Sequence, residues 1–168
     1  GALPPATAPA ARVVCVASIG HWFALPRRSA DSFPPNPGGS WYSPWPAYGL
    51  SKLSNIAHAA ELQRRYGGEG IGAVSLHPGV IKTELHRNNM LAKVFYTLGS
   101  VTFKSIAQGA ATQTLCAVRD DLVGGGFYSN CQHATARPDA LSAELGAALW
   151  DKSELACTEA REREQQSS

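Results

Sequence analysis

The stretch "IGAVSLHPG" (residues 71–79) is a short, mostly apolar run that ends at a Pro-Gly pair. Such a run, bounded by turn residues, predicts a strand buried inside a parallel sheet. A similar run, "RVVCVAS" (residues 12–18), lies upstream and lacks strict alternation. Between the two, residues 46–66 repeat apolar side chains at helical spacing, and a Gly-Gly pair ends the pattern. The sequence therefore reads strand, helix, strand.

The alternation continues downstream of this unit. A helix is predicted over residues 105–121, with Ser105 as its N-cap, and a short strand over 126–129. A short helix is expected within 87–99, and a last helix over 138–163. Strands alternating with helices indicate an α/β fold with a parallel sheet flanked by helices. We expect three parallel strands, in the spatial order 12–18, 71–76, 126–129, with the outer edge of the first strand uncovered.

Composition excludes several classes of protein. With 168 residues, 44% apolar and 17% charged, the chain fits one soluble domain of residues 12–163. Residues 1–11 are expected to be an irregular entry and 164–168 a polar tail. A net charge of +2 without a long basic run argues against nucleic acid, and no apolar run is long enough to span a membrane. Four scattered cysteines favour a reduced, cytoplasmic chain without a metal site.

The segment "AYGLSKLSN" (residues 47–55) places Tyr48 and Lys52 four residues apart on the predicted helix. This spacing puts both side chains on one face. A tyrosine titrates near pH 10, and an ammonium group held close favours its phenolate, which makes the pair a device for acid–base chemistry. On spacing alone, a surface tyrosine and lysine on a solvated helix is the commoner explanation. Ser18 ends the first strand and the Pro-Gly turn ends the second, so both lie at one sheet edge with the start of this helix.

Together, these segments resemble the second half of a short-chain dehydrogenase/reductase. The similarity is closer to the retinol dehydrogenases and WW-domain-containing oxidoreductases. It rests on the pieces "RVVCVAS", "AYGLSKLSNI", "GIGAVSLHPGVIKTELHR", "TFKSIAQGAATQTLCA" and "GGGFYSNC". The resemblance implies a partial Rossmann-like fold, a doubly wound parallel sheet whose first half is missing. It also implies an oxidoreductase that uses NAD or NADP to interconvert an alcohol and a carbonyl.

The family's functional residues carry over by position. Ser18 resembles the serine that orients the substrate oxygen, and Tyr48 resembles the acid/base that exchanges a proton with it. Lys52 resembles the lysine that assists this tyrosine and binds the nicotinamide ribose. The residues that resemble the turn around the nicotinamide are Pro78, Gly79, Ile81 and Thr83. The choice between NAD and NADP is not readable, because the residue that makes it has no counterpart here.

The family's Gly-rich strand–turn–helix unit, which holds the pyrophosphate, has no counterpart in the sequence. The cluster "GGEGIG" (residues 67–72) follows a helix and precedes a strand, which is the wrong order. With Gly1 as first residue and Met90 as the only methionine, we expect the chain to be part of a longer protein. Two hypotheses follow. The chain is the catalytic half of an oxidoreductase, inactive by itself, or it is a non-catalytic binding or dimerisation module.

Other residues leave alternatives open. His21 and Trp22 after the strand, and Trp41 and Trp45 in the Pro-rich loop, either line a substrate pocket or anchor loops. Residues 90–103 lie where the family places its substrate-binding lid, and are otherwise an amphipathic helix. The lid would suit an apolar substrate such as a retinoid or steroid. The resemblance also implies a possible homodimer through the Tyr48/Lys52 helix.

Overall fold

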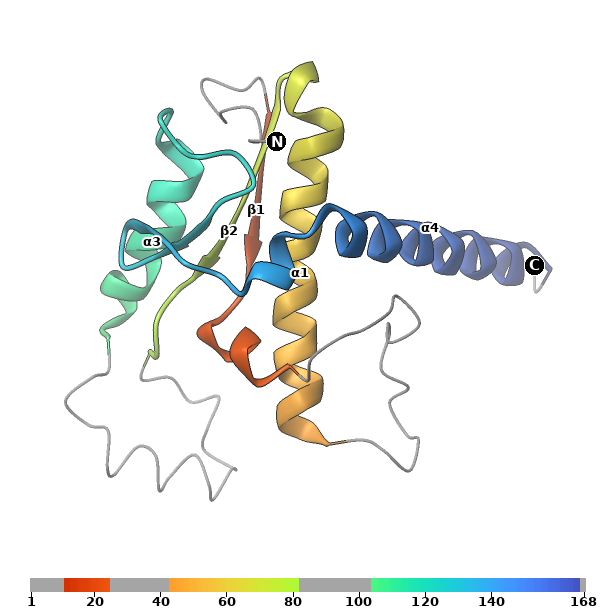
Figure 1. Ribbon diagram of the computed structural model, residues 1–168, viewed down its shortest axis with the longest axis horizontal. Helices are drawn as coiled ribbons and strands as arrows, with labels where there is room; N and C mark the ends of the chain where they lie inside the picture. The colour runs from red at the N-terminus through yellow and green to blue at the C-terminus, as the bar shows by residue number, and fades with distance from the viewer. Residues whose placement is uncertain (1–10, 25–42, 82–103, 167–168) are drawn as a thin grey trace.

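The computed structural model describes residues 11–24, 43–81 and 104–166, and these form a sheet between helices (Figure 1). Helix α1 lies on one side of the sheet and helix α3 on the other. The α/β architecture expected from the sequence is confirmed. In chain order the elements are β1 (Ala11–Val16), the 3₁₀ turn η1 (Ile19–Phe23), α1 (Pro44–Tyr66), η3 (Gly67–Glu69), β2 (Ile71–His77), α3 (Ile106–Val118), β3 (Phe127–Ser129), β4 (Gln132–Ala134), η5 (Pro138–Leu141) and α4 (Ala143–Gln166).

The four strands lie in the order β1-β2-β3-β4. Strands β1, β2 and β3 are parallel, as predicted, with Ala11 opposite Ile71 and Ser75 opposite Phe127. The sequence analysis missed β4, which pairs antiparallel with β3 through a tight turn at Asn130 and Cys131. Both turn residues have positive φ, of 52° and 60°. Asparagine tolerates this conformation, but cysteine is not a recognised turn residue, which explains the missed hairpin.

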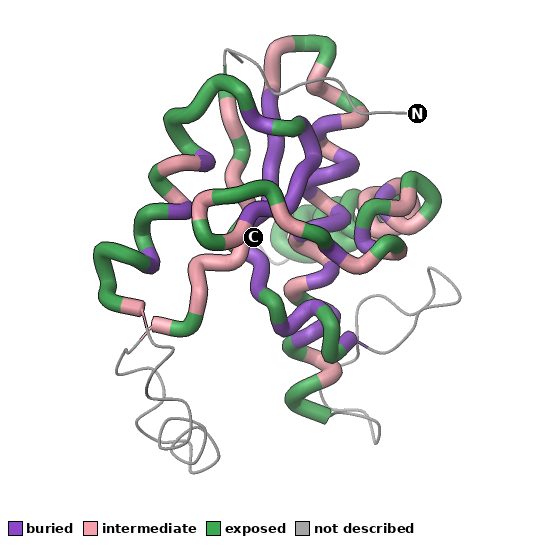
Figure 2. The backbone as a smooth tube through the Cα atoms, turned by 60° about the vertical axis from the view of Figure 1, so that its left-hand side comes forward, coloured by how far each residue is buried: buried purple, intermediate pink, exposed green. Residues whose placement is uncertain are grey.

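Strand β1 differs from the prediction in its burial. We expected it to be covered on both faces, but Val13 is 36% and Val16 43% exposed. The middle of β2, by contrast, is fully buried. Among the described residues β1 pairs only with β2, so its other edge is unpaired, as predicted. Figure 2 shows buried backbone gathered in the middle of the molecule.

The core has two parts, one on each face of the sheet. Phe127 packs with Leu50, Leu53 and Ile56 of α1, while its neighbour Tyr128 packs on the other face. Successive residues of a strand point to opposite faces, so this short strand contributes to both parts. The second part contains Val74, Leu76, Cys116, Leu122 and Tyr128. A sheet with apolar packing on both faces is the doubly wound arrangement that the sequence predicts.

Helix ends are largely as predicted. Ser105 caps α3, its hydroxyl accepting from the Gln108 N–H while the Gln108 side chain accepts from the Ser105 N–H. This capping box satisfies two backbone donors that the helix itself leaves open. The helix expected over 138–163 is instead two elements, because residues 138–141 form η5 and α4 begins at Ala143.

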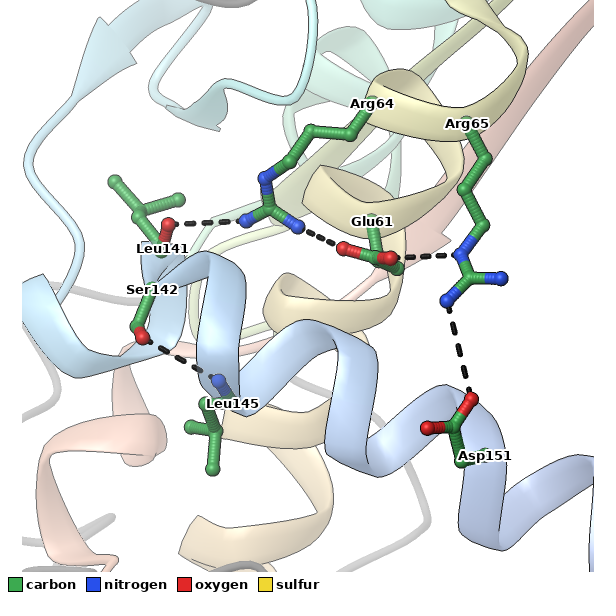
Figure 3. A network of polar contacts seen from close by, with 7 residues as sticks. All are labelled: Glu61, Arg64, Arg65, Leu141, Ser142, Leu145 and Asp151. Carbon is green, nitrogen blue, oxygen red and sulfur yellow. Dashed lines mark hydrogen bonds and ion pairs between the residues drawn. The ribbon is translucent and has the colours of Figure 1, made fainter. Parts of the chain in front are cut away.

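Helix α4 is held to α1 by a polar network around Glu61 (Figure 3). The Glu61 carboxylate is buried and accepts hydrogen bonds from both Arg64 and Arg65. Arg64 also donates to the Leu141 carbonyl at 3.0 Å, and Arg65 lies 3.9 Å from Asp151 of α4. The network thus joins the end of α1 to the start of α4. The outer part of α4 is exposed.

Several expectations fall outside the described residues. The short helix within 87–99, the segment 90–103, Trp41 and Thr83 are among them. In the described ranges, no helix is long and apolar enough to cross a membrane. No group of three or more metal-ligating side chains occurs there either.

Candidate active site

The candidate site lies where β1 ends. The strand stops at Val16, and Ser18 follows as the N-cap of η1, 8% exposed. Its Oγ accepts a hydrogen bond from the Gly20 N–H at 3.1 Å. A serine in this capping position is held by the backbone that follows it, and its own hydroxyl hydrogen is left for another acceptor.

Helix α1 brings Tyr48 and Lys52 to the same end of β1. The Lys52 Nζ lies 5.6 Å from the centre of the Tyr48 ring, so the two side chains share a face as the spacing predicts. Lys52 also donates to the Val16 carbonyl at 3.4 Å, and Asn55, one turn further on, donates to the same carbonyl at 3.0 Å. This oxygen is therefore a common anchor that ties α1 to the last residue of β1.

Two glycines allow α1 and η1 to approach closely. A Cβ on Gly49 would stand 2.5 Å from the Ala24 nitrogen, so only a glycine fits there. A Cβ on Gly20 would lie 2.6 Å from Cε1 of Tyr48 and 3.4 Å from the Ser18 Oγ. Both groups therefore border the same point, and the structure brings the Ser18 hydroxyl and the Tyr48 ring together. Tyr48 is 42% exposed, whereas Ser18 is buried.

The Pro-Gly turn after β2 is shaped by residues from α3 and from just before it. Gly79 has φ 93°, and Lys104 occupies the space that a Cβ on Gly79 would need. The Lys104 N–H donates to the Val80 carbonyl at 2.9 Å, and Ile81 forms an isolated parallel bridge with Lys104. The Ile81 side chain fits against α3 only because residue 109 is a glycine. The turn is therefore held in one shape at the carboxyl end of β2.

Two histidines lie near this edge, and neither is a free base at the surface. Burial, with smaller contributions from Lys104 and His21, lowers the pKa of His77 to about 4. Among the described residues, the His77 Nδ1 has no hydrogen-bond partner. Burial also lowers the pKa of His21, which is completely buried. His21 therefore does not line an open pocket, one of the two alternatives that its sequence position left.

Exposed apolar side chains occur on η1 and at the start of α1, the elements that carry Ser18 and Tyr48. Phe23 of η1 packs edge-on against Trp45 of α1, with ring centres 5.8 Å apart. The exposed apolar residues of η1, of the start of α1 and of the Pro-Gly turn are Ile19, Trp22, Phe23, Trp45 and Val80. Exposed apolar side chains on neighbouring elements are typical of a surface that binds apolar ligands.

Sequence reasoning missed Asn55, Lys104 and the two close-contact glycines. Asn55 is one turn beyond Lys52 on the same face, so helical spacing offered a signal. Lys104 precedes the N-cap of α3. The sequence offered no signal for it, because its contact with Gly79 joins segments 25 residues apart.

The chain is similar to several short-chain dehydrogenases and related oxidoreductases, although no family model matches it. It is 36% identical over 145 residues to retinol dehydrogenase 12 of Mus musculus, covering 85% of the chain and 44% of the relative. It is 36% identical over 150 residues to the WW domain-containing oxidoreductase of Gallus gallus, covering 86% and 36%. The short-chain dehydrogenase TIC 32 B of Brassica napus is 34% identical, with 83% and 45% covered. The chain thus spans less than half the length of these relatives.

A solved structure is similar over a comparable share of the chain. An uncharacterized protein from Mycobacterium paratuberculosis superimposes with a TM-score of 0.59 and 33% sequence identity. The match covers 86% of this chain and 49% of the other. The likeness therefore extends over the sheet and helices described above, and again reaches about half of the longer protein.

Proposed function

Because this chain belongs to the short-chain dehydrogenase/reductase family, we propose that Ser18, Tyr48 and Lys52 are the catalytic residues of an NAD(P)-dependent oxidoreductase. The reaction is the interconversion of an alcohol and a carbonyl. The observation that carries the proposal is the convergence of the Ser18 hydroxyl and the Tyr48 ring at Gly20, with Lys52 on the same face of α1.

Each residue has a defined role in the proposed reaction. In the oxidising direction, the Tyr48 oxygen accepts the hydroxyl proton of the alcohol, and in the reducing direction it returns a proton to the carbonyl oxygen. Ser18 donates a hydrogen bond to that same oxygen, which fixes the reacting carbon in place. Lys52 provides the positive charge beside the phenol. A bound nicotinamide supplies the hydride acceptor or donor.

The residues present suit the nicotinamide end of such a cofactor. Gly79 forms a turn with positive φ at the carboxyl end of β2, and Lys52 and Lys104 are cations near this edge. Pro78, Gly79, Ile81 and Thr83 are the proposed nicotinamide contacts. The sequence holds no Gly-rich turn between a strand and a helix that would hold a pyrophosphate. We therefore propose that this chain by itself does not turn over substrate.

The exposed apolar residues of η1 and of the start of α1 support an apolar alcohol or carbonyl as the substrate class. Ile19, Trp22 and Phe23 of η1 and Trp45 of α1 offer aromatic and aliphatic surface, with no charged side chain among them. A homodimer through α1 is also proposed. Only the first half of the helix offers an open face, because Trp150 of α4 stacks on His58 and lies against Tyr66.

Cofactor titration and a complemented enzyme test the function. The purified chain, titrated with NADH and NADPH by fluorescence, is expected to show no micromolar binding. Joined to the amino-terminal half of a family member, which supplies the Gly-rich unit, it is expected to oxidise or reduce an apolar substrate. Tyr48→Phe should then lower kcat at least about a hundredfold. Tyr66→Phe, a tyrosine on the same helix but beside Trp150, should leave kcat unchanged.

Two results would overturn the proposal. One is a complemented protein that binds cofactor but turns over no alcohol or carbonyl. The other is Tyr48→Phe with the kcat of the unchanged protein. The first result would favour the alternative, a non-catalytic binding or dimerisation module. The second would show that Tyr48 is not a catalytic residue.

A further inference from the structure

His21 is the one fully buried histidine of the described residues, and it lies three positions after Ser18. Its Nδ1 is 2.7 Å from the Ser18 carbonyl oxygen. Its Nε2 accepts a hydrogen bond from the Arg137 N–H at 3.3 Å. The ring also packs edge-on against Phe127, with centres 5.2 Å apart. Both ring nitrogens are therefore used inside the fold.

The two contacts define which nitrogen carries the proton. A backbone N–H can only donate, so the Nε2 facing Arg137 is the acceptor. In the neutral ring the hydrogen then lies on Nδ1, which donates to the Ser18 carbonyl. Burial lowers the pKa of His21 and favours this neutral form. The charged or titratable groups that face the ring are Arg137, Asp139 and His77. The hydrogen bond to the Ser18 carbonyl and the Asp139 carboxylate act against burial and raise the pKa of His21.

The same distant segment also holds the other end of η1. The Arg137 guanidinium donates to the Ala24 carbonyl, and Asp139 pairs with that guanidinium through both carboxylate oxygens. Both ends of the turn therefore contact residues 137–139. Ser18 does so through His21, and Ala24 does so directly. Contacts with this distant segment therefore hold the turn that begins at Ser18.

We infer that His21 is a positioning residue: its Nδ1–H, donated to the Ser18 carbonyl, fixes the turn that aims the Ser18 hydroxyl at the substrate oxygen. The inference rests on the role proposed for Ser18. The physical link is short, because the Ser18 Oγ accepts from the Gly20 N–H, and Gly20 lies between Ser18 and His21. A change in the direction of the Ser18 carbonyl therefore changes the place of its hydroxyl.

Two substitutions separate the two contacts of His21. An asparagine amide nitrogen stands near the place of Nδ1, so His21→Asn keeps the donor to Ser18 and loses the acceptor for Arg137. A glutamine amide reaches the place of Nε2, so His21→Gln keeps the acceptor and loses the donor. A role confined to tying η1 to Arg137 would make Gln the milder change. The positioning role makes Asn the milder change.

Hydrogen exchange at the Gly20 N–H reads the Ser18 hydroxyl directly and needs no activity. In His21→Gln, the protection of Gly20 is expected to fall about tenfold, the value of one hydrogen bond, while the amides of α1 and β2 keep theirs. In His21→Asn, the protection of Gly20 is expected to stay close to that of the unchanged chain. In the complemented enzyme, Gln should lower kcat about tenfold with KM unchanged, and Asn should restore it.

The outcomes are distinguishable from a failure of the proposed function. Equal protection of Gly20 in both variants, or a loss spread over α1 and β2, overturns the positioning role whatever the enzyme does. An enzyme in which Ser18→Ala keeps full activity overturns the catalytic role of Ser18, and with it the inference, even if Gly20 behaves as expected.

Discussion

The aromatic ring of Tyr48 lies directly against the backbone of Gly20, with ring atom Cε1 2.6 Å from the point where a Cβ would stand. Gly20 is buried between Ser18 and α1 and has no room for even one methyl group. The Tyr48 ring therefore occupies space that is free only because residue 20 of η1 is a glycine. This contact connects the sequence of η1 with the position of the phenol on α1.

Gly20→Ala is expected to destabilise the chain by about 1–3 kcal/mol, because the methyl group overlaps the Tyr48 ring and forces a shift. The free energy of unfolding in urea measures it. Gly68→Ala is the matched control, since a Cβ there meets nothing within 4 Å. It should change stability by no more than about 0.5 kcal/mol. Equal effects of the two substitutions would contradict the close contact.

Glu61→Gln is expected to destabilise the chain by about 1.5–3 kcal/mol, because the buried carboxylate accepts from two arginines and the neutral amide weakens both bonds. Glu159→Gln is the control, since its pair with Arg163 has the same i, i+4 spacing but is exposed. That change should stay within about 0.5 kcal/mol. Urea unfolding of both variants decides the comparison, and a larger effect at Glu159 would show that the network around Glu61 does not secure α4.

His77 should make the stability of the chain depend on pH. Its pKa falls from the ordinary 6.5 to about 4 on folding, so between these values the unfolded chain binds more protons than the folded one. The stability from neutral His77 is complete above pH 6.5 and is lost as pH falls toward 4. Urea unfolding at several pH values should show a shallower slope in His77→Gln. His133→Gln, at an exposed position on β4, should keep the original slope. A slope unchanged by His77→Gln would refute the burial argument.

The unpaired edge of β1 should make the chain associate with itself. Its outer backbone groups have no partner strand among residues that the structure describes, and Val13 and Val16 add exposed apolar surface. Such edges associate unless charge protects them. Sedimentation at rising concentration should show association that Val13→Lys reduces. Val118→Lys, at an exposed valine on α3, is the control and should change nothing. A monodisperse monomer at all concentrations would contradict the prediction.

The order of elements could be predicted because it follows from local patterns. The apolar run of β2 and the helical spacing of α1 each appear within about 20 residues, and both elements are where we expected them. Ser105 showed its capping role through residue type and position alone. Strand β4 was missed because the turn before it contains a cysteine, which is uncommon in turns. The break between η5 and α4 at Ser142 was missed because no glycine or proline marks it.

The sequence by itself determined the α/β alternation and the shared face of Tyr48 and Lys52, because each depends on periodicity or spacing within one segment. It also determined the parallel order of three strands, because strands joined through helices follow a fixed crossover rule. Only the tertiary structure decided that β1 is half exposed, that His21 is buried rather than open to ligand, and that Gly20 seats the Tyr48 ring. These depend on contacts between segments far apart in the chain, such as His21 with Arg137 and Lys104 with Gly79. Contacts between residues far apart in the sequence leave no local pattern in it. The burial of a side chain is decided only when helices and sheet pack together.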